Sequence, residues 1–410
     1  MTQSIGEVAR AAQAAYEALE GWSAGQTITA GAIRAEAQVR TARPGQITVE
    51  YQTYEDPLSE FEERYVGGPE YLGDELLGLQ FVHNARGTWI YDPKSDVAVH
   101  KPGKTLYCPL RGIDALGEVS FLRNLTHDFL LRDAGTEEIN GRSARLIGLK
   151  PKVRQRSLLL KEELFPVSRA TIALDEETHF PLRIVLYPAE PSPLFYLIGP
   201  STPVTIEYRK PRLDPPDAAR FTFTPGESTR VFEEKTLTQE TLSKRLPFRF
   251  PLDPFSDLGY SLHRGRATLT ANRAGDRAYA LLTLTPTQDE DISDGSRALS
   301  LRIGNYLSRN MSRRRALLAE KGEAIELESV KARLLDRAAL LADELPQSLD
   351  RTILEVGWER DGVHAFLLGD GVNREELLNI ASTLMTTDEA PEVPEPDETE
   401  EGSPRQQSEA

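Results

Sequence analysis

Cysteine is almost absent from this sequence. Its 410 residues include a single cysteine, Cys108. One thiol cannot form an internal disulfide or a cysteine-based zinc site, so both are excluded, whereas the redox compartment stays undecided. No basic residue stands directly beside Cys108, so we expect a packing residue rather than a reactive thiol.

Clusters of positive charge are also rare. The chain has 48 Lys and Arg against 64 Asp and Glu, which gives a formal net charge of −16. Basic residues are dispersed except at Arg313-Arg314-Arg315, which we expect on a solvated helix face or loop, with a partner contact as the alternative. Nucleic acids and anionic membranes attract proteins through basic patches, so neither is an expected partner.

Long apolar runs are missing as well. No uninterrupted apolar stretch is long enough to span a bilayer. The first residues, Met1 to Glu7, lack the basic and apolar regions of a signal peptide. As written, the chain is expected to be soluble and to carry no leader.

Motifs that carry catalysis are missing too. The histidines are scattered, without metal-ligand spacing: His83, His100, His127, His179, His263 and His364. Gly369-Asp370-Gly371 lacks the glycine spacing and the lysine of a phosphate-binding loop, and we expect a strand-to-helix turn there. There is no Gly-x-Ser-x-Gly motif. The sequence therefore predicts no catalytic residues, no metal, no cofactor and no enzymatic activity.

Alternating hydrophobicity dominates the first 230 residues. Ser4 and Glu7 predict a capped amphipathic helix up to Gly21. Beyond it, period-two runs predict successive antiparallel strands at 27–30, 33–39, 47–51, 170–175, 181–187, 205–208 and 221–223. Residues 118–128 have helical spacing, and residues 55–78 follow neither pattern. We therefore expect a mainly β (α+β) fold, with a large antiparallel sheet and a few helices against it.

The stretch from Gly87 to Pro93 organises this region. Its aromatic and β-branched residues predict a strand, and Asp92-Pro93 predicts a turn into the next strand. Alternation places Trp89 and Tyr91 on one face and Thr88 and Ile90 on the other. Both faces carry bulky apolar side chains, so we expect other parts of the chain to pack on each side of this strand.

The rest of the chain predicts a second domain, because 410 residues exceed one core. Strands are expected at 267–269, 279–285, 299–303, 353–360 and 363–368, and a helix capped by Asn373 at 372–384. The acidic 386–410 segment is expected to be disordered. The predicted division is 1–232, a linker at 233–245, a smaller α+β domain at 246–385, and the tail.

Several stretches together resemble the LolA lipoprotein-carrier family and its relative, the N-terminal domain of the RseB/MucB regulators. They are the N-terminal helix, the 87–93 strand and turn, 140–152, 181–185 and 221–225, in that order along the chain. Residues 246–384 are similar to a module that follows such domains in bacterial envelope proteins. The missing leader and the 55–78 insertion depart from the family pattern.

The resemblance implies an open antiparallel half-barrel with covering helices over an apolar cavity. It implies non-enzymatic binding of lipid or lipoprotein acyl chains by a periplasmic or extracytoplasmic carrier. An RseB-like sensor acting on a membrane-bound anti-sigma factor is the alternative, and an envelope protein with a fully packed core is a third possibility. The residues expected to contact the ligand are Trp89, Tyr91, Phe121, Leu125, Leu174 and Ile184.

Overall fold

The computed structural model describes residues 4–55, 73–103, 125–152, 167–188, 202–248, 253–287, 297–341 and 352–386. Its helices are α1 (Ile5–Ala18), α3 (Leu125–Asp128), α5 (Gln239–Arg245), α6 (Asp253–Asp257), α7 (Arg309–Lys321), α8 (Arg337–Leu341) and α9 (Arg374–Thr386), with 3₁₀ helices η1 (Gly73–Leu76) and η4 (Ala218–Phe221). Of the predicted insertion at 55–78, residues 56–72 lie outside the described residues and its end holds η1, whereas the tail at 386–410 lies outside them after residue 386.

The described strands belong to one open sheet of 19 strands. They are β1 (Gly21–Ala30), β2 (Ile33–Ala42), β3 (Gln46–Glu55), β4 (Gln80–Asn84), β5 (Gly87–Asp92), β6 (Val97–Pro102), β7 (Phe129–Ile139), β8 (Arg142–Pro151), β9 (Val167–Asp175), β10 (Pro181–Pro188), β11 (Val204–Arg212), β12 (Arg230–Leu237), β13 (Tyr260–Asn272), β14 (Ala278–Pro286), β15 (Ala298–Gly304), β16 (Glu323–Leu327), β17 (Val330–Asp336), β18 (Ile353–Arg360) and β19 (Val363–Asp370). The expected mainly β class with an open antiparallel sheet is confirmed.

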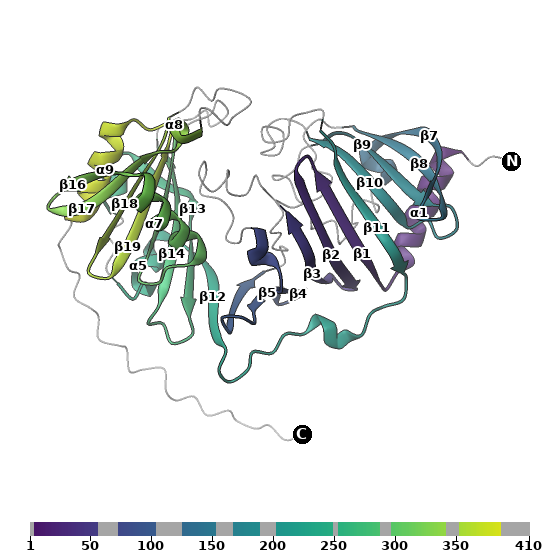
Figure 1. Ribbon diagram of the computed structural model, residues 1–410, viewed down its shortest axis with the longest axis horizontal. Coiled ribbons are helices and arrows are strands. Elements are labelled where there is room, and N and C mark those ends of the chain that lie inside the picture. The colour runs from purple at the N-terminus through teal and green to yellow at the C-terminus, as the bar shows by residue number, and fades with distance from the viewer. Residues whose placement is uncertain are drawn as a thin grey trace, which may run out of the picture.

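The strand pairings give the spatial order of the sheet. It runs β7-β8-β9-β10-β11-β1-β2-β3-β4-β5-β6 and continues through β12-β13-β14-β15-β19-β18-β17-β16. Among these ladders β6–β12 is parallel, and the others are antiparallel. We call β1–β11 with α1 and α3 the half-barrel, and β12–β19 with α5–α9 the C-terminal unit. Figure 1 shows the half-barrel on the right and the C-terminal unit on the left.

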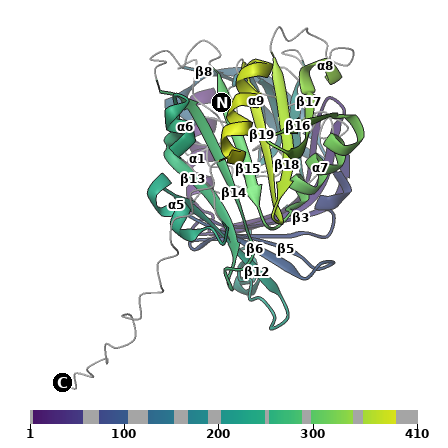
Figure 2. The same cartoon turned by 90° about the vertical axis from the view of Figure 1, so that its left-hand side faces the viewer.

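Each part has its own hydrophobic cluster. One contains buried side chains between Val8 and Tyr208, and the other contains buried side chains between Leu242 and Met385. In the C-terminal unit, Leu367 packs in the second cluster with α9, whereas its neighbour Phe366 packs with α7. Since successive strand residues face opposite sides, α9 and α7 cover opposite faces of the sheet (Figure 2).

Local sequence chemistry accounts for several element boundaries. The Ser4 hydroxyl accepts from the Glu7 N–H at 3.4 Å and the Glu7 carboxylate accepts from the Ser4 N–H at 2.7 Å, as expected for the capping box of α1. Asp361 and Gly362 have φ values of 51° and 75° in the β18–β19 turn, where the left-handed region favours glycine. Asn373 accepts from the Glu376 N–H at 2.9 Å, which confirms it as the cap of α9.

The segment between β11 and β12 differs from the prediction. Residues 221–223 were expected to form a strand, but Phe221 ends η4 and the residues after it are irregular. This segment runs along the lower side of the molecule from β11 to β12 (Figure 1). The carbonyl of Phe221 accepts from Asn84 of β4 at 3.1 Å, so the segment is attached to the half-barrel without adding a strand. Residues 233–245, the predicted linker, hold the end of β12 and helix α5.

Candidate functional site

The inner face of the half-barrel is apolar. Alternate residues of β1 and β2 point into the first hydrophobic cluster because side chains alternate across a strand. On β1 they are Trp22, Ala24, Gln26, Ile28 and Ala30, and on β2 they are Ile33, Ala35, Ala37 and Val39. Four of these nine residues are alanines, so the middle of this wall has short side chains.

Helix α1 covers part of this face. Its buried residues Val8, Ala9, Ala12 and Tyr16 belong to the same cluster. At its end, Arg43 donates to the carbonyls of Glu17 at 2.5 Å and Tyr16 at 2.6 Å. The Tyr16 carbonyl also accepts from the Leu19 N–H at 3.2 Å, so the arginine adds a second donor there and one at Glu17, and thereby ties α1 to the β2–β3 turn.

Three of the expected ligand residues lie in this cluster. Leu125 of α3, Leu174 of β9 and Ile184 of β10 are each 0% exposed. The structure therefore places them together on the inner side of the half-barrel. Contact with a ligand stays a prediction.

Trp89 and Tyr91 lie elsewhere. Ile90 of β5 joins the inner cluster at 1% exposure, so Trp89 and Tyr91 point to the outer face. There Trp89 stacks on His100 with ring centroids 4.4 Å apart, and Phe223 packs against Trp89 at 5.2 Å and Tyr91 at 5.0 Å. The expected six-residue set is thus divided between two faces, and the expectation that the hairpin's aromatic side chains line the inner face was wrong. Phe121 and Cys108 lie outside the described residues.

Sequence reasoning missed three inner residues. Trp22 is 2% exposed, and its ring packs edge-on against Phe180 at 5.2 Å and Tyr208 at 5.5 Å. Gln26 and Tyr208 are both 0% exposed. A signal was available, because Gln26 is the one polar residue in the alternating row Trp22, Ala24, Gln26, Ile28, Ala30.

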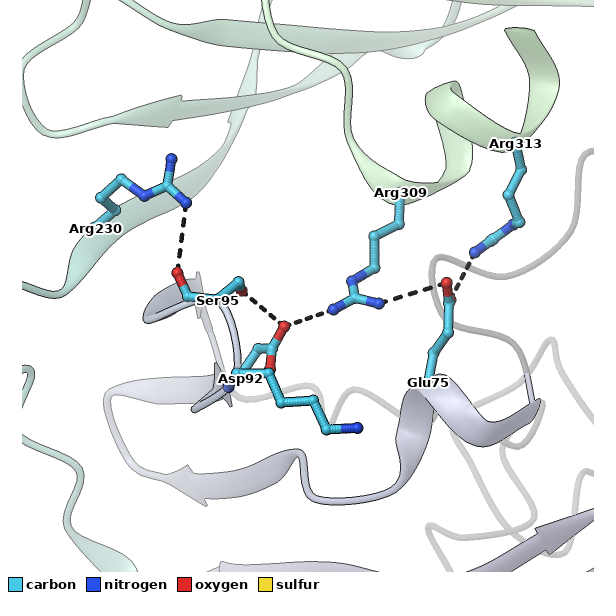
Figure 3. Close-up of polar contacts among 7 residues, drawn as sticks. Glu75, Asp92, Ser95, Arg230, Arg309 and Arg313 are labelled. Carbon is cyan, nitrogen blue, oxygen red and sulfur yellow. Dashed lines mark hydrogen bonds and ion pairs between the residues drawn. The ribbon is translucent and has the colours of Figure 1, made fainter. Parts of the chain in front are cut away.

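A charged contact joins the half-barrel to the C-terminal unit (Figure 3). Arg309 of α7 donates to Asp92 at 2.5 Å and lies 3.4 Å from a Glu75 oxygen, and Arg313 donates to Glu75 at 2.7 Å. Partial burial raises the pKa of Asp92, but hydrogen bonds from the Ser95 hydroxyl, the Lys94 N–H and Arg309 outweigh it, so the pKa is lowered. The carboxylate therefore stays ionised and keeps its attraction for Arg309.

The three neighbouring arginines have different environments. Arg315 pairs with Glu359 and is 57% exposed, as expected of a solvated helix face. Arg314 is 0% exposed and pairs with Glu355, which also accepts from Arg337. The expectation of a solvated face was therefore wrong for Arg314, because its partner lies 41 positions away on β18.

A cavity of about 590 Å³ lies in the C-terminal unit between the end of α7 and the start of α9. Its floor is apolar, with Leu334, Leu335, Leu340 and Leu354. At its rim Arg374 donates to both carboxylate oxygens of Glu323, at 2.9 and 3.0 Å. Lys321 and Asp336 also line the cavity, so its charged residues number two of each sign.

Two negative findings apply to the part of the chain that the structure describes. Across it, no three His, Cys, Asp or Glu side chains gather as a metal site requires. None of its helices is both long and apolar enough to cross a membrane.

No family model matches the sequence. No curated protein matches it either. Solved structures do match. MucB of Pseudomonas aeruginosa, in complex with MucA, is 12% identical with a TM-score of 0.30, over 92% of this chain and 96% of that chain.

Two further solved structures match about half of this chain, each over nearly its own whole length. The Mycobacterium tuberculosis lipoprotein LppX is 12% identical with a TM-score of 0.31, over 52% of this chain and 99% of that one. A LolA superfamily protein from Nitrosomonas europaea is 12% identical with a TM-score of 0.26, over 54% and 99% of the two chains. The structures found thus include both kinds of protein that the sequence resembles. At these TM-scores the similarity carries no argument about function, which rests on the side chains described above.

Proposed function

We propose that the half-barrel binds acyl chains of lipids or lipoproteins without covalent chemistry, as a carrier of the bacterial envelope. The observation that supports this is the apolar inner face of an open sheet, covered by α1 and α3. An open sheet with a helical cover can admit an acyl chain where the cover moves. The proposal places the protein outside the cytoplasm, and assigns it no catalytic residues and no cofactor.

The energy available for such binding follows from the apolar surface that is buried. Each buried methylene contributes about 0.8 kcal/mol, so ten methylenes contribute roughly 8 kcal/mol before the entropy cost of binding. Ala24, Ala35 and Ala37 have short side chains. Long side chains at these positions would occupy the space that the ligand needs. Binding of this kind requires no charged group.

The first experiment is lipid mass spectrometry on protein purified from its native host. We expect acyl lipids or lipopeptides to copurify, and to rebind after extraction. Protein that carries no lipid and binds none after extraction would contradict the proposal.

Truncation variants separate a ligand-binding wall from a packed core. In a packed core, Leu174→Ala or Ile184→Ala costs about 2–5 kcal/mol of unfolding free energy. In a ligand-binding wall the cost lies at or below the low end of that range and acyl-chain affinity falls. Urea unfolding and ligand titration on the same two variants decide between these outcomes, with Leu146→Ala, whose side chain packs in a separate small cluster, as the control.

A sensor is the second candidate, since the C-terminal unit is coupled to the half-barrel through β6–β12 and through Arg309 and Arg313. In this case a ligand in the half-barrel changes how the C-terminal unit contacts a membrane-bound envelope protein. Hydrogen exchange with and without ligand distinguishes the carrier from the sensor, because a carrier changes protection only in the half-barrel, whereas a sensor also changes it in β12 and α7.

We also propose that residues 1–232 and 246–385 are two domains.

A further inference from the structure

The half-barrel and the C-terminal unit share a short stretch of sheet. Strand β12 pairs with β6 over residues 230–233 and with β13 over residues 232–237. Within these two ladders, only Phe232 and Glu233 are paired with a strand on both sides. Each hydrophobic cluster of the described residues takes its side chains from one part alone. Parts that share no apolar core can move relative to each other, so this strand connection has the properties of a hinge.

The turn between β5 and β6 fixes the start of β12 to the half-barrel. The Asp96 carboxylate of this turn accepts from the Ser228 and Thr229 hydroxyls, each at 2.8 Å. The Asp96 carbonyl accepts from the Arg230 N–H at 3.0 Å. The parallel ladder begins at the same residue, where Arg230 lies opposite Val97. None of these bonds involves helix α7, so they would hold β12 in place if α7 moved away.

Helix α7 provides a second attachment between the two parts. Its buried residues Met311 and Leu318 pack with Phe366 of β19, so α7 moves with the C-terminal unit. Arg309 and Arg313 are four positions apart on the same helix and therefore lie on one face. Both of these arginines contact the half-barrel (Figure 3).

Two carboxylates of the half-barrel pair with these arginines. Asp92, at the end of β5, lies 2.5 Å from Arg309, and its side chain is 7% exposed. Glu75 of η1 lies 3.4 Å from Arg309 and 2.7 Å from Arg313. The residue after it, Leu76, is 0% exposed in the first hydrophobic cluster and fixes η1 to the half-barrel. The carboxylates are therefore held on one part and the arginines on the other.

We propose that these four residues form a charge latch, and that the C-terminal unit turns on the β6–β12 ladder when the latch opens. The side chains of Glu75, Arg309 and Arg313 are between 21% and 36% exposed, so salt reaches the ion pairs. Salt weakens attraction between charges, whereas the backbone ladder and the Asp96 bonds keep β12 attached. The inference concerns the connection between the two parts, so it applies to a carrier and to a sensor alike.

The test measures the distance between two spin labels on the full chain by pulsed electron paramagnetic resonance. Glu50→Cys on β3 and Lys331→Cys on β17 place one label at an exposed position of each part, and Cys108→Ser removes the native thiol. In about 0.1 M salt charges act over about 10 Å, and we expect one narrow distribution of distances. In about 1 M salt this range falls to about 3 Å, and we expect a second population of distances.

Removing the two arginines should open the latch without added salt. Arg309→Ala with Arg313→Ala should raise the ratio of open to closed protein about tenfold or more, which is the ratio that a hydrogen bond to a charged group gives. The matched control is Arg315→Ala with Lys321→Ala. It removes the same charge from exposed positions of the same helix, and should keep the narrow distribution.

Exchanging the charges tests the pairing itself. Glu75→Lys changes the half-barrel side of the latch and should also open it, because the new lysine repels Arg309 and Arg313. Adding Arg313→Glu to Glu75→Lys restores opposite charges at this position, and should recover part of the narrow distribution. This exchange also replaces the double alanine variant if that variant folds poorly.

Four results overturn the inference. They are a double alanine variant that keeps the native distribution, a control variant that opens as far as the double alanine variant, a charge exchange that recovers nothing, and native protein whose distribution is the same at both salt concentrations. Lipid binding enters none of these measurements, so failure of the proposed function and failure of the latch are distinguishable.

Discussion

The buried ion cluster of the C-terminal unit allows a quantitative prediction. Glu355 of β18 accepts from Arg314 of α7 and from Arg337 of α8, and all three side chains are 0% exposed. Burial raises the pKa of Glu355, but the two guanidinium groups lower it by more, so it remains a carboxylate. The Glu355→Gln substitution keeps the shape of the side chain and leaves two buried positive charges without a counter-charge.

Breaking a buried ion pair in this way costs about 3–5 kcal/mol, because the remaining charge stays desolvated. If the unfolding free energy falls by about 2 kcal/mol per M urea, the unfolding midpoint of the C-terminal unit should fall by roughly 2 M. Pulse-labelling hydrogen exchange along a urea series, measured on peptides from β18 and β19, reports this unit separately from the half-barrel.

The matched control is Glu323→Gln, which removes the same charge from an ion pair with Arg374. Both side chains of that pair are more than half exposed, at 57% and 54%. Exposed pairs contribute little to stability because water and salt screen them, so the midpoint should hardly move. Equal losses for Glu355→Gln and Glu323→Gln would refute the reasoning. As a further check, replacing all three buried charged residues with Met, Met and Leu should restore most of the stability, because no charge then remains buried.

Three further predictions address other parts of the molecule. Because Trp22 lies in the inner cluster and Trp89 on the outer face, Trp22→Phe should abolish a ligand-induced change in tryptophan fluorescence, and Trp89→Phe should keep it; the opposite result would move the site to the outer face. Because the pKa of Asp92 is lowered in the folded protein, its contribution to stability is present above its unfolded pKa near 4 and is lost as the pH falls through the lower folded value. Urea unfolding between pH 3 and pH 7 should therefore show that Asp92→Asn loses less unfolding free energy in acid than the native protein does. An equal dependence of the unfolding free energy on pH in both proteins would contradict the role of this carboxylate. Gly304→Ala should cost about 1–3 kcal/mol, since its Cβ would lie 2.6 Å from the Ala278 carbonyl oxygen, whereas Gly25→Ala, whose nearest contact is 3.8 Å, should be tolerated in the same thermal unfolding assay.

Local features of the fold could be predicted from the sequence. The capping box of α1, the Asn373 cap and the Asp361-Gly362 turn each depend on residues within four positions of one another. The strand alternation at 87–91 also predicted which side chains share a face. It did not predict which face meets the core, because both faces of β5 carry apolar residues.

Features that depend on distant residues could not be predicted. Arg314 looks like its two neighbours in sequence, and only Glu355 and Arg337 explain its burial. The inner cluster likewise brings Trp22 of β1 against Tyr208 of β11, which is far away in sequence.

The parallel β6–β12 ladder has a consequence for how the chain matures during synthesis. The ribosome makes β12 about 130 residues after β6, so β6 remains an uncovered strand edge while the intervening residues are made. Uncovered edges pair with other chains, and β6 offers alternating valines, Val97 and Val99, to such pairing. A chain cut before β12 would keep the edge of β6 uncovered permanently. A chain cut after β12 would instead leave uncovered the edge of β12 that pairs with β13. Nascent chains that stall in this interval are therefore the ones expected to aggregate or to recruit a chaperone.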